Sequence, residues 1–399
     1  AEAEGSRKLP HVRKVTLQWC AALAACVCLL LGWGFIAQHL SGIADYTGDE
    51  TKVTGAAETA QADGAGISLS EMAAAQDVQQ QEQQNADTWP KTFTVTLGGD
   101  TTLGSTDDLR KRDDCFENVA AEKGYGWFFS GLESLFASDD MTLINFEGTL
   151  TDETSKKQKL YNFKGPAEYA DILTLGSVEA VNVANNHTLD YGQQGKEDTI
   201  ANLEAAGIIV SGGGQLGIFE KDGVKVGMTG YCFPYKDGKK DISADVKALR
   251  EAGCQIVIAS FHWGSEYRDD FTGEQRTIGR AAIKAGADIV VGTHPHIVQG
   301  IEAYQDSYIL YSLGNLVFGG NVDPDDRDAY LARVTFTVYE DHCDAPELTV
   351  VPIRLTALDK GTDYRPVVAD ETDSERIFKR ILKLSSNMSD FVNGELSAY

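Results

Sequence analysis

The chain has 399 residues, 42% of them hydrophobic, and is long enough to bury a full-sized core in one large or two medium domains. Its formal net charge is -25, from 60 acidic and 35 basic residues. Nucleic acids and anionic lipid surfaces bind through basic patches, so this charge argues against either as the main partner. An anionic substrate would need a bound cation to offset the repulsion, and metal ligands are therefore worth seeking.

An uncharged run of apolar and small residues extends from Trp19 to Ala37, and with residues 15–18 it reaches the ~20 residues that cross a bilayer. Basic residues precede the run and acidic residues follow it: Arg7, Lys8, Arg13 and Lys14 before it, and Asp45, Asp49 and Glu50 after it. The positive-inside rule predicts a cytoplasmic tail at residues 1–14, a single-pass membrane anchor at residues 15–40, and an extracellular location for the rest.

Two alternatives to a permanent anchor stay open. One is a cleaved signal peptide, because Gly42-Ile43-Ala44 resembles a cleavage site, although the apolar run is long for such a peptide. The other is lipidation, because Leu23-Ala24-Ala25-Cys26 resembles a bacterial lipobox. Apolar residues continue from Val27 to Leu31, however, where a lipoprotein normally turns polar.

Residues 41–90 are rich in Gly, Ala, Thr, Gln and acids, and they include a glutamine tract from Gln79 to Gln84. So few large apolar residues cannot form a core, and the segment is predicted to be a flexible stalk that holds the next domain off the membrane. After Pro90 short β-rich apolar runs alternate with helical stretches, which predicts one α/β domain over residues 91–399.

The predicted strands of this domain are Phe93–Leu97, Met141–Phe146, Ala180–Ala184, Val224–Tyr231, Gln255–Phe261, Asp288–Val291, Tyr308–Leu313, Leu331–Tyr339 and Leu348–Leu355. The predicted helices are Trp127–Ala137, Pro166–Leu175, Gly195–Ala206, Ile242–Ala252 and Gly273–Ala285. Because the last strands follow one another without helices between them, we expect the C-terminal portion to be antiparallel.

Four cysteines lie beyond the predicted anchor: Cys115, Cys232, Cys254 and Cys343. An extracytoplasmic domain permits two disulfides among them, with three connectivities that the sequence does not separate. Buried free thiols are the alternative, since Cys232 and Cys254 lie in or beside apolar strands.

Polar and ionisable residues recur just past the ends of the predicted strands, where ligand sites of α/β sheets assemble. They are Asp100, Glu147, Asn186, His187, His262, His294 and His296. Each has an ordinary structural explanation: a turn cap for Asp100, a surface acid for Glu147, a helix cap for Asn186, or a hydrogen-bonded core histidine for His262. As a set they predict a polar or metal site.

The pair His294 and His296 is the sharpest local signal. In an extended segment, residues i and i+2 point to the same side, so both imidazoles can face one ion, and Pro295 between them fixes φ. Imidazole, carboxylate and amide oxygen together suit manganese, iron or zinc.

The region from Phe93 to Leu355 carries six motifs in one order. They are Gly99-Asp100 with Gly104, Asn145-Phe146-Glu147-Gly148, Ala184-Asn185-Asn186-His187 with Asp190-Tyr191-Gly192, His262-Trp263-Gly264 with Glu266-Tyr267, Gly286-Ala287-Asp288 leading to His294-Pro295-His296, and Tyr311-Ser312-Leu313-Gly314-Asn315. In this order they resemble the CapA family of poly-γ-glutamate capsule biosynthesis proteins.

The resemblance implies the fold of calcineurin-like metallophosphoesterases, a two-sheet α/β/β/α sandwich. It also implies that one or two divalent ions (Mn, Fe or Zn) are held by Asp100, Glu147, Asn186, His262, His294 and His296. His187 would be the acid that protonates a leaving group. The chain departs from the phosphoesterase pattern, because Asp-x-His survives only as Asp100-Thr101-Thr102 and the usual bridging-aspartate motif is replaced by one carrying Glu147.

Three functions follow from this interpretation. The first is an accessory of capsule synthesis at the cell surface, handling poly-γ-glutamate or another anionic envelope polymer beside other membrane subunits. The second is a metal-dependent phosphoesterase or related hydrolase that acts on a cell-envelope substrate. The third is a metal-free binding module that kept the fold and lost the chemistry.

Overall fold

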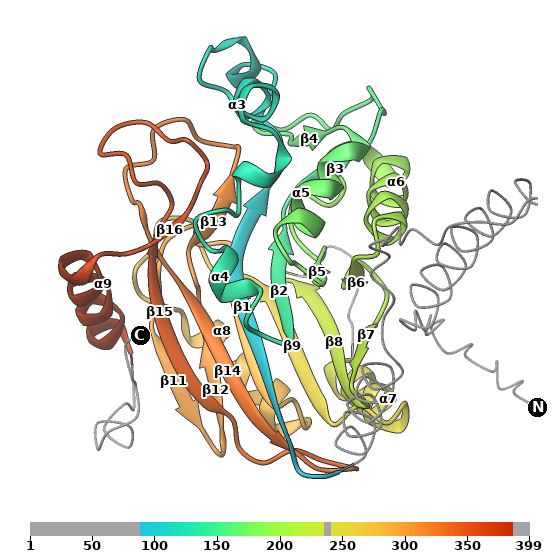
Figure 1. Ribbon diagram of the computed structural model, residues 1–399. Coiled ribbons are helices and arrows are strands. Elements are labelled where there is room, and N and C mark those ends of the chain that lie inside the picture. The colour runs from blue at the N-terminus through green and yellow to red at the C-terminus, as the bar shows by residue number, and fades with distance from the viewer. Residues whose placement is uncertain (1–87, 235–240, 386–399) are drawn as a thin grey trace, which may run out of the picture. The chain divides into compact units, whose positions relative to one another are not determined.

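A computed structural model describes residues 88–234 and 241–385 of the chain (Figure 1). The predicted anchor and nearly all of the predicted stalk lie outside these residues. Within the described ranges, no helix combines the length and apolar character that crossing a bilayer requires. The described fold is therefore that of the α/β domain alone.

Two mixed β-sheets form the centre of the domain. The first contains, in pairing order, β16 (Val367–Val368), β15 (Glu347–Arg354), β14 (Asp328–Val338), β1 (Lys91–Thr102), β2 (Met141–Phe146), β5 (Ala180–Asn182) and β6 (Ile209–Ser211), with β13 (Asn315–Phe318) beside the end of β1. The second contains β11 (Ile301–Tyr304), β12 (Ser307–Leu310), β10 (Ile289–Thr293), β9 (Ile256–His262), β8 (Val224–Cys232) and β7 (Gly217–Lys221). A small sheet pairs β3 (Thr149–Leu150) with β4 (Lys164–Gly165).

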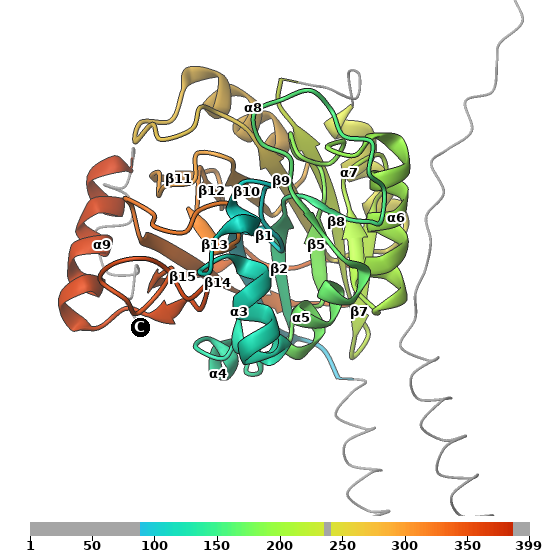
Figure 2. The same ribbon diagram turned by 90° about the horizontal axis from the view of Figure 1, so that it is seen from above.

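Helices cover the outer faces of both sheets. In Figure 2, α3, α4 and α5 lie along one side and α7 and α8 along the opposite side, with the strands between them. The helices are α3 (Phe116–Lys123), α4 (Glu133–Phe136), α5 (Ala170–Leu175), α6 (Gly192–Ala205), α7 (Ile242–Glu251), α8 (Gly273–Lys284) and α9 (Glu371–Leu384). Three 3-10 turns span Leu109–Lys111, Tyr125–Trp127 and Ala167–Tyr169. The expected α/β class is confirmed.

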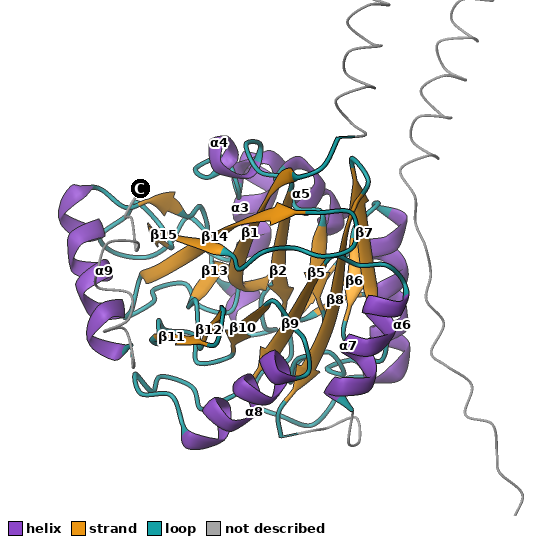
Figure 3. Cartoon of the chain, turned by 90° about the horizontal axis from the view of Figure 1, so that it is seen from below, coloured by secondary structure: helices purple, strands orange, loops and turns teal. Residues whose placement is uncertain are grey.

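The core forms three layers because strand side chains alternate between faces. On β9, Ile256 and Ile258 enter the apolar layer between the two sheets, whereas Val257 and Ala259 face α7 and α8. A third apolar layer packs the other face of the first sheet against α3 to α6. Helix α9 contacts β15 and β11 and buries Ile377 and Ile381 in the middle layer, so it closes one edge of the sandwich (Figure 3).

The parallel strands are what position the site. Strands β1, β2, β5 and β6 run parallel in the first sheet, and β8, β9, β10 and β12 run parallel in the second. The C-terminal strands β14, β15 and β16 pair antiparallel, as predicted. Loops that follow the parallel strands of both sheets therefore meet at their carboxyl ends.

One predicted helix is wrong in its extent. Trp127–Ala137 was expected to be continuous, but only a 3-10 turn at its start and α4 near its end are helical. Gly131 lies between them, and a Cβ there would stand 2.3 Å from the carbonyl oxygen of Pro366. The predicted apolar stripe is nevertheless buried, with Phe128 and Leu132 both 0% exposed.

The four cysteines in the described part of the chain are free thiols. Cys115 and Cys254 are buried, and Cys232 and Cys343 are partly buried. Of the two alternatives that the sequence left open, the structure therefore has the free thiols.

Candidate metal centre

The strand ends of the two sheets bring the predicted residues together. Asp100 lies near the end of β1, Glu147 follows β2 directly, His262 ends β9, and His294 and His296 follow β10. The register fixes the neighbours within each sheet, because Asp100 pairs with Asn145 across β1 and β2, and His262 pairs with Thr293 across β9 and β10.

One group of three candidate ligands consists of Asp100, Glu147 and His262. One ligand atom from each lies within 4.8 Å of the others. Nδ1 of His262 is 3.7 Å from Oδ1 of Asp100, and its Nε2 is 3.8 Å from Oε1 of Glu147. All three residues are buried, with exposed fractions of 1% or less. This spacing leaves room for an ion in contact with all three.

A second group shares Glu147 and adds His294 and His296, again with ligand atoms within 4.8 Å of one another. The ring centroids of the two histidines are 5.9 Å apart, and that of His294 is 4.5 Å from that of His262. Two ligand groups that share one carboxylate form the kind of arrangement that holds a pair of ions.

The backbone of the histidine pair differs from the prediction. An extended segment was expected, but His294 has φ +98° and His296 has φ +60°, both in the left-handed region. Non-glycine residues adopt this region at a cost of order 1–3 kcal/mol each, and such strain clusters at functional sites. The main-chain N–H of His294 donates a hydrogen bond of 3.0 Å to Oδ2 of Asp100. This bond ties the strained loop to β1.

Three buried polar atoms in the cluster fit a cation. Among the described residues, no group donates a hydrogen bond to either carboxylate oxygen of Glu147, and Nδ1 of His294 also has no hydrogen-bond partner there. A buried carboxylate without donors is costly unless a cation satisfies it. The donor set of carboxylates, imidazoles and one amide suits manganese, iron or zinc, and such an ion would supply Lewis acidity and an activated water.

The electrostatics of the cluster also call for positive charge. Burial, and then the charge of Asp100, raise the pKa of Glu147 well above its ordinary value. Burial lowers the pKa of His296, but the charges of Glu147 and Asp100 outweigh it and raise that pKa to about 10. Burial alone would raise the pKa of Asp100, but its interactions with His296 and the main-chain N–H of His294 hold it below its ordinary value. A divalent ion would supply the positive charge that these carboxylates otherwise draw from His296.

The sequence did not predict a role for the amide side chains that orient the candidate ligands. Asn145 donates a 2.7 Å hydrogen bond to Oδ1 of Asp100 and lies 3.3 Å from Nδ1 of His262. Asn182 in turn donates to Oδ1 of Asn145 at 2.9 Å. Amides in this position fix the rotamers of the residues that touch a metal. The sequence did contain a signal for Asn145, because it belongs to the same motif as Glu147.

Asn315 and Thr293 hold the imidazoles in the same way. The amide oxygen of Asn315 lies 2.9 Å from Nδ1 of His296, and the hydroxyl of Thr293 lies 3.1 Å from Nδ1 of His262. With its Nδ1 occupied in this way, His262 directs its Nε2 toward Glu147.

Asn186 and His187 lie at the outer side of the cluster. The amide oxygen of Asn186 is 2.8 Å from Nε2 of His262, and Nε2 of His187 is 3.6 Å from Oε1 of Glu147. Burial lowers the pKa of His187, although a hydrogen bond with Asp190 opposes that shift. The structure thus brings all seven predicted site residues into one cluster.

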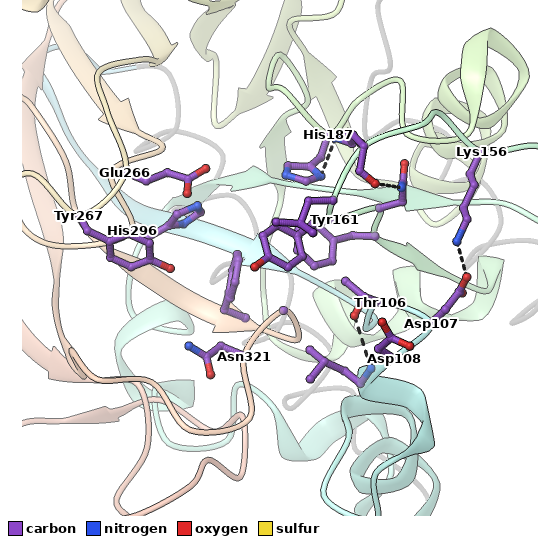
Figure 4. Close-up of a pocket in the computed structure, with 17 residues that line it drawn as sticks. Thr106, Asp107, Asp108, Lys156, Tyr161, His187, Glu266, Tyr267, His296 and Asn321 are labelled. Atoms are coloured by element: carbon purple, nitrogen blue, oxygen red, sulfur yellow. Dashed lines mark hydrogen bonds and ion pairs between the residues drawn. The ribbon is translucent and has the colours of Figure 1, made fainter.

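A pocket of about 480 Å³ opens directly onto this cluster, and both His187 and His296 line it. In Figure 4, Glu266, Tyr267 and His296 lie on one side, Lys156 and Asp107 lie on the other, and Tyr161 lies between them. The remaining lining residues are Thr106, Asp108, Leu109, Lys159, Leu160, Asn162, Phe163, Phe318, Gly320 and Asn321. A ligand in this pocket would reach the candidate metal centre without any opening of the core.

Known proteins share this sequence pattern. A family model described as "Bacterial capsule synthesis protein PGA_cap" matches residues 94–320. The chain is 29% identical over 303 residues to "PGA biosynthesis protein CapA" of Bacillus subtilis (strain 168), covering 69% of this chain and 80% of that protein. It is 25% identical over 334 residues to "Capsule biosynthesis protein CapA" of Bacillus anthracis, covering 74% and 78% of the two chains.

Two solved structures are also similar, at low identity. A hypothetical protein from Thermus thermophilus matches with a TM-score of 0.40 and 14% identity, covering 65% of this chain and 99% of that one. A 5'-nucleotidase from Candida albicans matches with a TM-score of 0.36 and 12% identity, covering 66% of this chain and 51% of that one.

Proposed function

The chain belongs to the PGA_cap family of bacterial capsule synthesis proteins, and from this premise we propose that it is a membrane-anchored accessory of poly-γ-glutamate synthesis or export whose extracellular domain uses a divalent metal. The observation that carries the metal proposal is Glu147, a fully buried carboxylate that meets imidazoles and a second carboxylate instead of donors. Residues 15–40 would be the anchor, and other capsule-synthesis membrane subunits would be its neighbours.

Charge supports a role for the metal in handling such a polymer. Poly-γ-glutamate carries a free carboxylate on every residue, and the chain itself has a net charge of -25. Two polyanions repel each other, so contact between them needs a cation at the meeting point. The pocket in front of the cluster would admit one or a few residues of the polymer to that cation.

A genetic complementation experiment tests this proposal. Deleting the gene should reduce the amount or the attachment of surface polyglutamate, and the wild-type gene should restore both. Glu147→Gln should fail to restore them, whereas Glu347→Gln, at an exposed position on β15, should succeed. If surface polymer were unchanged after the deletion, the proposal would be wrong.

The topology has a separate test. Protease added to intact cells should degrade the region after residue 90 and spare the N-terminal tail. Full protection of that region in intact cells, followed by degradation after lysis, would contradict an extracellular domain.

Hydrolysis is a second candidate function, favoured by His187. Its Nε2 stands 3.6 Å from Glu147, its ring lines the pocket, and its Nδ1 lies 2.8 Å from the carboxylate of Asp190. An imidazole held by a carboxylate beside a metal centre can protonate a leaving group. The purified full chain with Mn²⁺ and a panel of phosphodiesters is the assay. Equal rates for the wild type and His296→Ala would exclude metal-dependent hydrolysis.

A further inference from the structure

Exposed apolar side chains gather at the mouth of the pocket that opens onto the candidate metal centre. Of the seven large apolar or aromatic side chains that are exposed in the described part of the chain, three line this one pocket. They are Leu160, Tyr161 and Tyr267, at 82%, 53% and 64% exposed. Single exposed apolar residues are ordinary, but a group of them in a concave site indicates a surface that binds something.

The backbone holds Tyr267 at the mouth in a strained conformation. Tyr267 lies in the loop after β9 with φ +57°, in the left-handed region that non-glycine residues rarely adopt. Its main-chain N–H donates a 2.9 Å hydrogen bond to the carbonyl oxygen of Pro295, between the two candidate histidine ligands. Its ring centroid is 6.1 Å from that of His296. Strain of this kind clusters at functional sites, so the position of this ring calls for a function.

Tyr161 reaches the same pocket from a different segment, the loop between β3 and β4. The N–H of Lys157 donates a 2.8 Å hydrogen bond to the carbonyl oxygen of Asp190, and the N–H of Phe163 donates one of 2.7 Å to the carboxylate of Asp190. Tyr161 therefore lies in a stretch of chain that is held on both sides. Figure 4 shows Tyr161 and Tyr267 among the side chains that line the pocket.

Aromatic rings continue from the mouth of the pocket to the candidate metal centre. The ring centroid of Phe318 is 5.0 Å from that of His296 and 5.8 Å from that of Phe163. Both phenylalanines line the pocket. Ring faces and edges pack against flat or hydrocarbon groups, so this lining suits an uncharged part of a ligand.

The ammonium groups of the pocket are already paired with acids of the protein. Lys156 pairs with Asp107, and Lys159 pairs with Asp190 (Figure 4). The lining side chains include three carboxylates against two ammonium groups, so they do not attract an anion as a set. An anionic group would therefore be held by a bound metal ion rather than by these lysines. The rest of such a ligand has to be recognised through its uncharged part.

We propose that Tyr161 and Tyr267 form a subsite for the uncharged amide-and-methylene segment of an acidic polyamide chain, while the candidate metal centre receives a neighbouring carboxylate. This inference rests on the proposed function. A γ-linked glutamate chain fits the subsite, because an amide and a short run of methylenes separate each carbon that bears a carboxylate from the next. A polyphosphate is charged at every unit and has no segment that the rings could hold.

The test is the binding of a short γ-linked glutamate oligomer to the purified full chain in Mn²⁺, measured by calorimetric titration. Tyr161→Ala and Tyr267→Ala should each weaken binding by about tenfold, because each removes a ring that packs on the ligand. Tyr161→Phe and Tyr267→Phe should bind like the wild type, since the rings rather than the hydroxyls make the contact. Leu175→Ala, which removes a side chain that is 60% exposed outside this pocket, is the matched control and should leave binding unchanged.

Two further titrations separate the rings from the metal. Mn²⁺ alone should bind the two alanine variants with the wild-type affinity. Polyphosphate, as a second anionic probe, should bind the wild type and the two alanine variants equally, because it meets the metal and not the rings.

Several outcomes would overturn the tyrosine subsite. If both alanine variants bound the oligomer with wild-type affinity, the subsite would be wrong and the proposed function would stand. If the wild type did not bind the oligomer in Mn²⁺, both would be wrong. A matching loss of Mn²⁺ or polyphosphate affinity in the alanine variants would also overturn it, as would tighter binding of an uncharged oligosaccharide that those variants lose.

Discussion

Glu147 and Glu302 are two glutamates of this domain whose side chains are equally buried, at 0% exposed, but their surroundings are opposite. Arg280 donates to Oε1 of Glu302 through Nε at 3.0 Å and through a second guanidinium nitrogen, and the hydroxyl of Tyr311 donates to Oε2. Glu147 meets Asp100 and four imidazoles, and within the described residues nothing donates a hydrogen bond to it.

The difference separates a structural buried acid, Glu302, from a candidate metal ligand, Glu147. The guanidinium and hydroxyl donors around Glu302 replace the hydrogen bonds that its carboxylate would make to water. These contacts also join α8 to β11. The carboxylate of Glu147 lies beside a second acid and has no such donors, and the proposed metal ion would supply the positive charge that it lacks. If this distinction is right, the two residues respond oppositely to mutation, metal and pH.

The largest effect is expected at Glu302. Glu302→Ala removes the acceptor of the partly exposed guanidinium of Arg280 and of the buried hydroxyl of Tyr311, so the two lost hydrogen bonds should cost ~3 kcal/mol in the free energy of unfolding. Urea denaturation should show this loss equally in chelator and in Mn²⁺. The exposed Glu347→Gln is the control and should stay within about 0.5 kcal/mol of the wild type. If Mn²⁺ restored the stability that Glu302→Ala loses, the contrast between Glu302 and Glu147 would not hold.

Glu147 should behave in the opposite way. In chelator at neutral pH, Glu147→Gln should be at least as stable as the wild type, because it removes an uncompensated buried acid. Mn²⁺ at a hundred times its Kd should stabilise the wild type by ~2.7 kcal/mol and leave Glu147→Gln unchanged. Thermal unfolding with and without Mn²⁺ measures both. An equal shift in the two proteins would show that the ion binds elsewhere.

The pH dependence sharpens the contrast further. The pKa of His296 is raised to about 10 in the folded chain, while an unfolded histidine titrates near ~6.5. Its contribution to stability is therefore fully present below pH ~6.5 and is lost as pH rises toward 10, by up to about 1.4 kcal/mol per pH unit. Urea unfolding in chelator between pH 6 and pH 10 measures this slope.

Two histidine variants serve as controls for the pH experiment. His296→Gln should flatten the slope, and the exposed His342→Gln should keep it. If stability in chelator did not fall over this range, the carboxylates would not be holding a proton on His296.

The smallest effect is expected from the amides around the cluster. Asn315→Ala removes the acceptor at Nδ1 of His296 and should weaken metal binding by ~10-fold, as is typical for groups that orient a ligand. Calorimetric titration with Mn²⁺ measures the affinity. Asn118→Ala, at an exposed position on α3, should leave the affinity unchanged. Equal affinities for the two variants would mean that His296 does not touch the ion.

The candidate ligands could be predicted from the sequence because they follow the ends of predicted strands. Parallel strands deliver their following residues to one edge, so Asp100, Glu147, His262 and the histidine pair could be grouped from strand ends alone. Strand ends carry no information about backbone conformation, and the left-handed φ of His294 and His296 was therefore not predicted. The same loop is held by a tertiary hydrogen bond from the His294 N–H to Asp100, a contact that strand ends do not reveal.

The network at Glu302 was not predicted either. Strand β11 has four residues, one of them Glu302, and so shows no apolar run. Arg276 and Arg280 lie one turn apart on α8, which suggests a solvated helix face until β11 is placed against it. Asp190 belongs to a motif that the sequence singled out, but no role could be predicted for it. Its partners Phe163 and Lys157 come from a loop whose sequence shows no helical or strand periodicity.

The most direct test of the metal centre is the divalent metal content of the purified full chain after equilibration with Mn²⁺, Fe²⁺ or Zn²⁺ and removal of free ion. We predict stoichiometric metal in the wild type and in Glu302→Gln, and its loss in a chain carrying both Asp100→Ala and His294→Ala. Wild-type protein that retains no more metal than this double variant would contradict the metal centre, and Glu147 would then need another explanation for its burial.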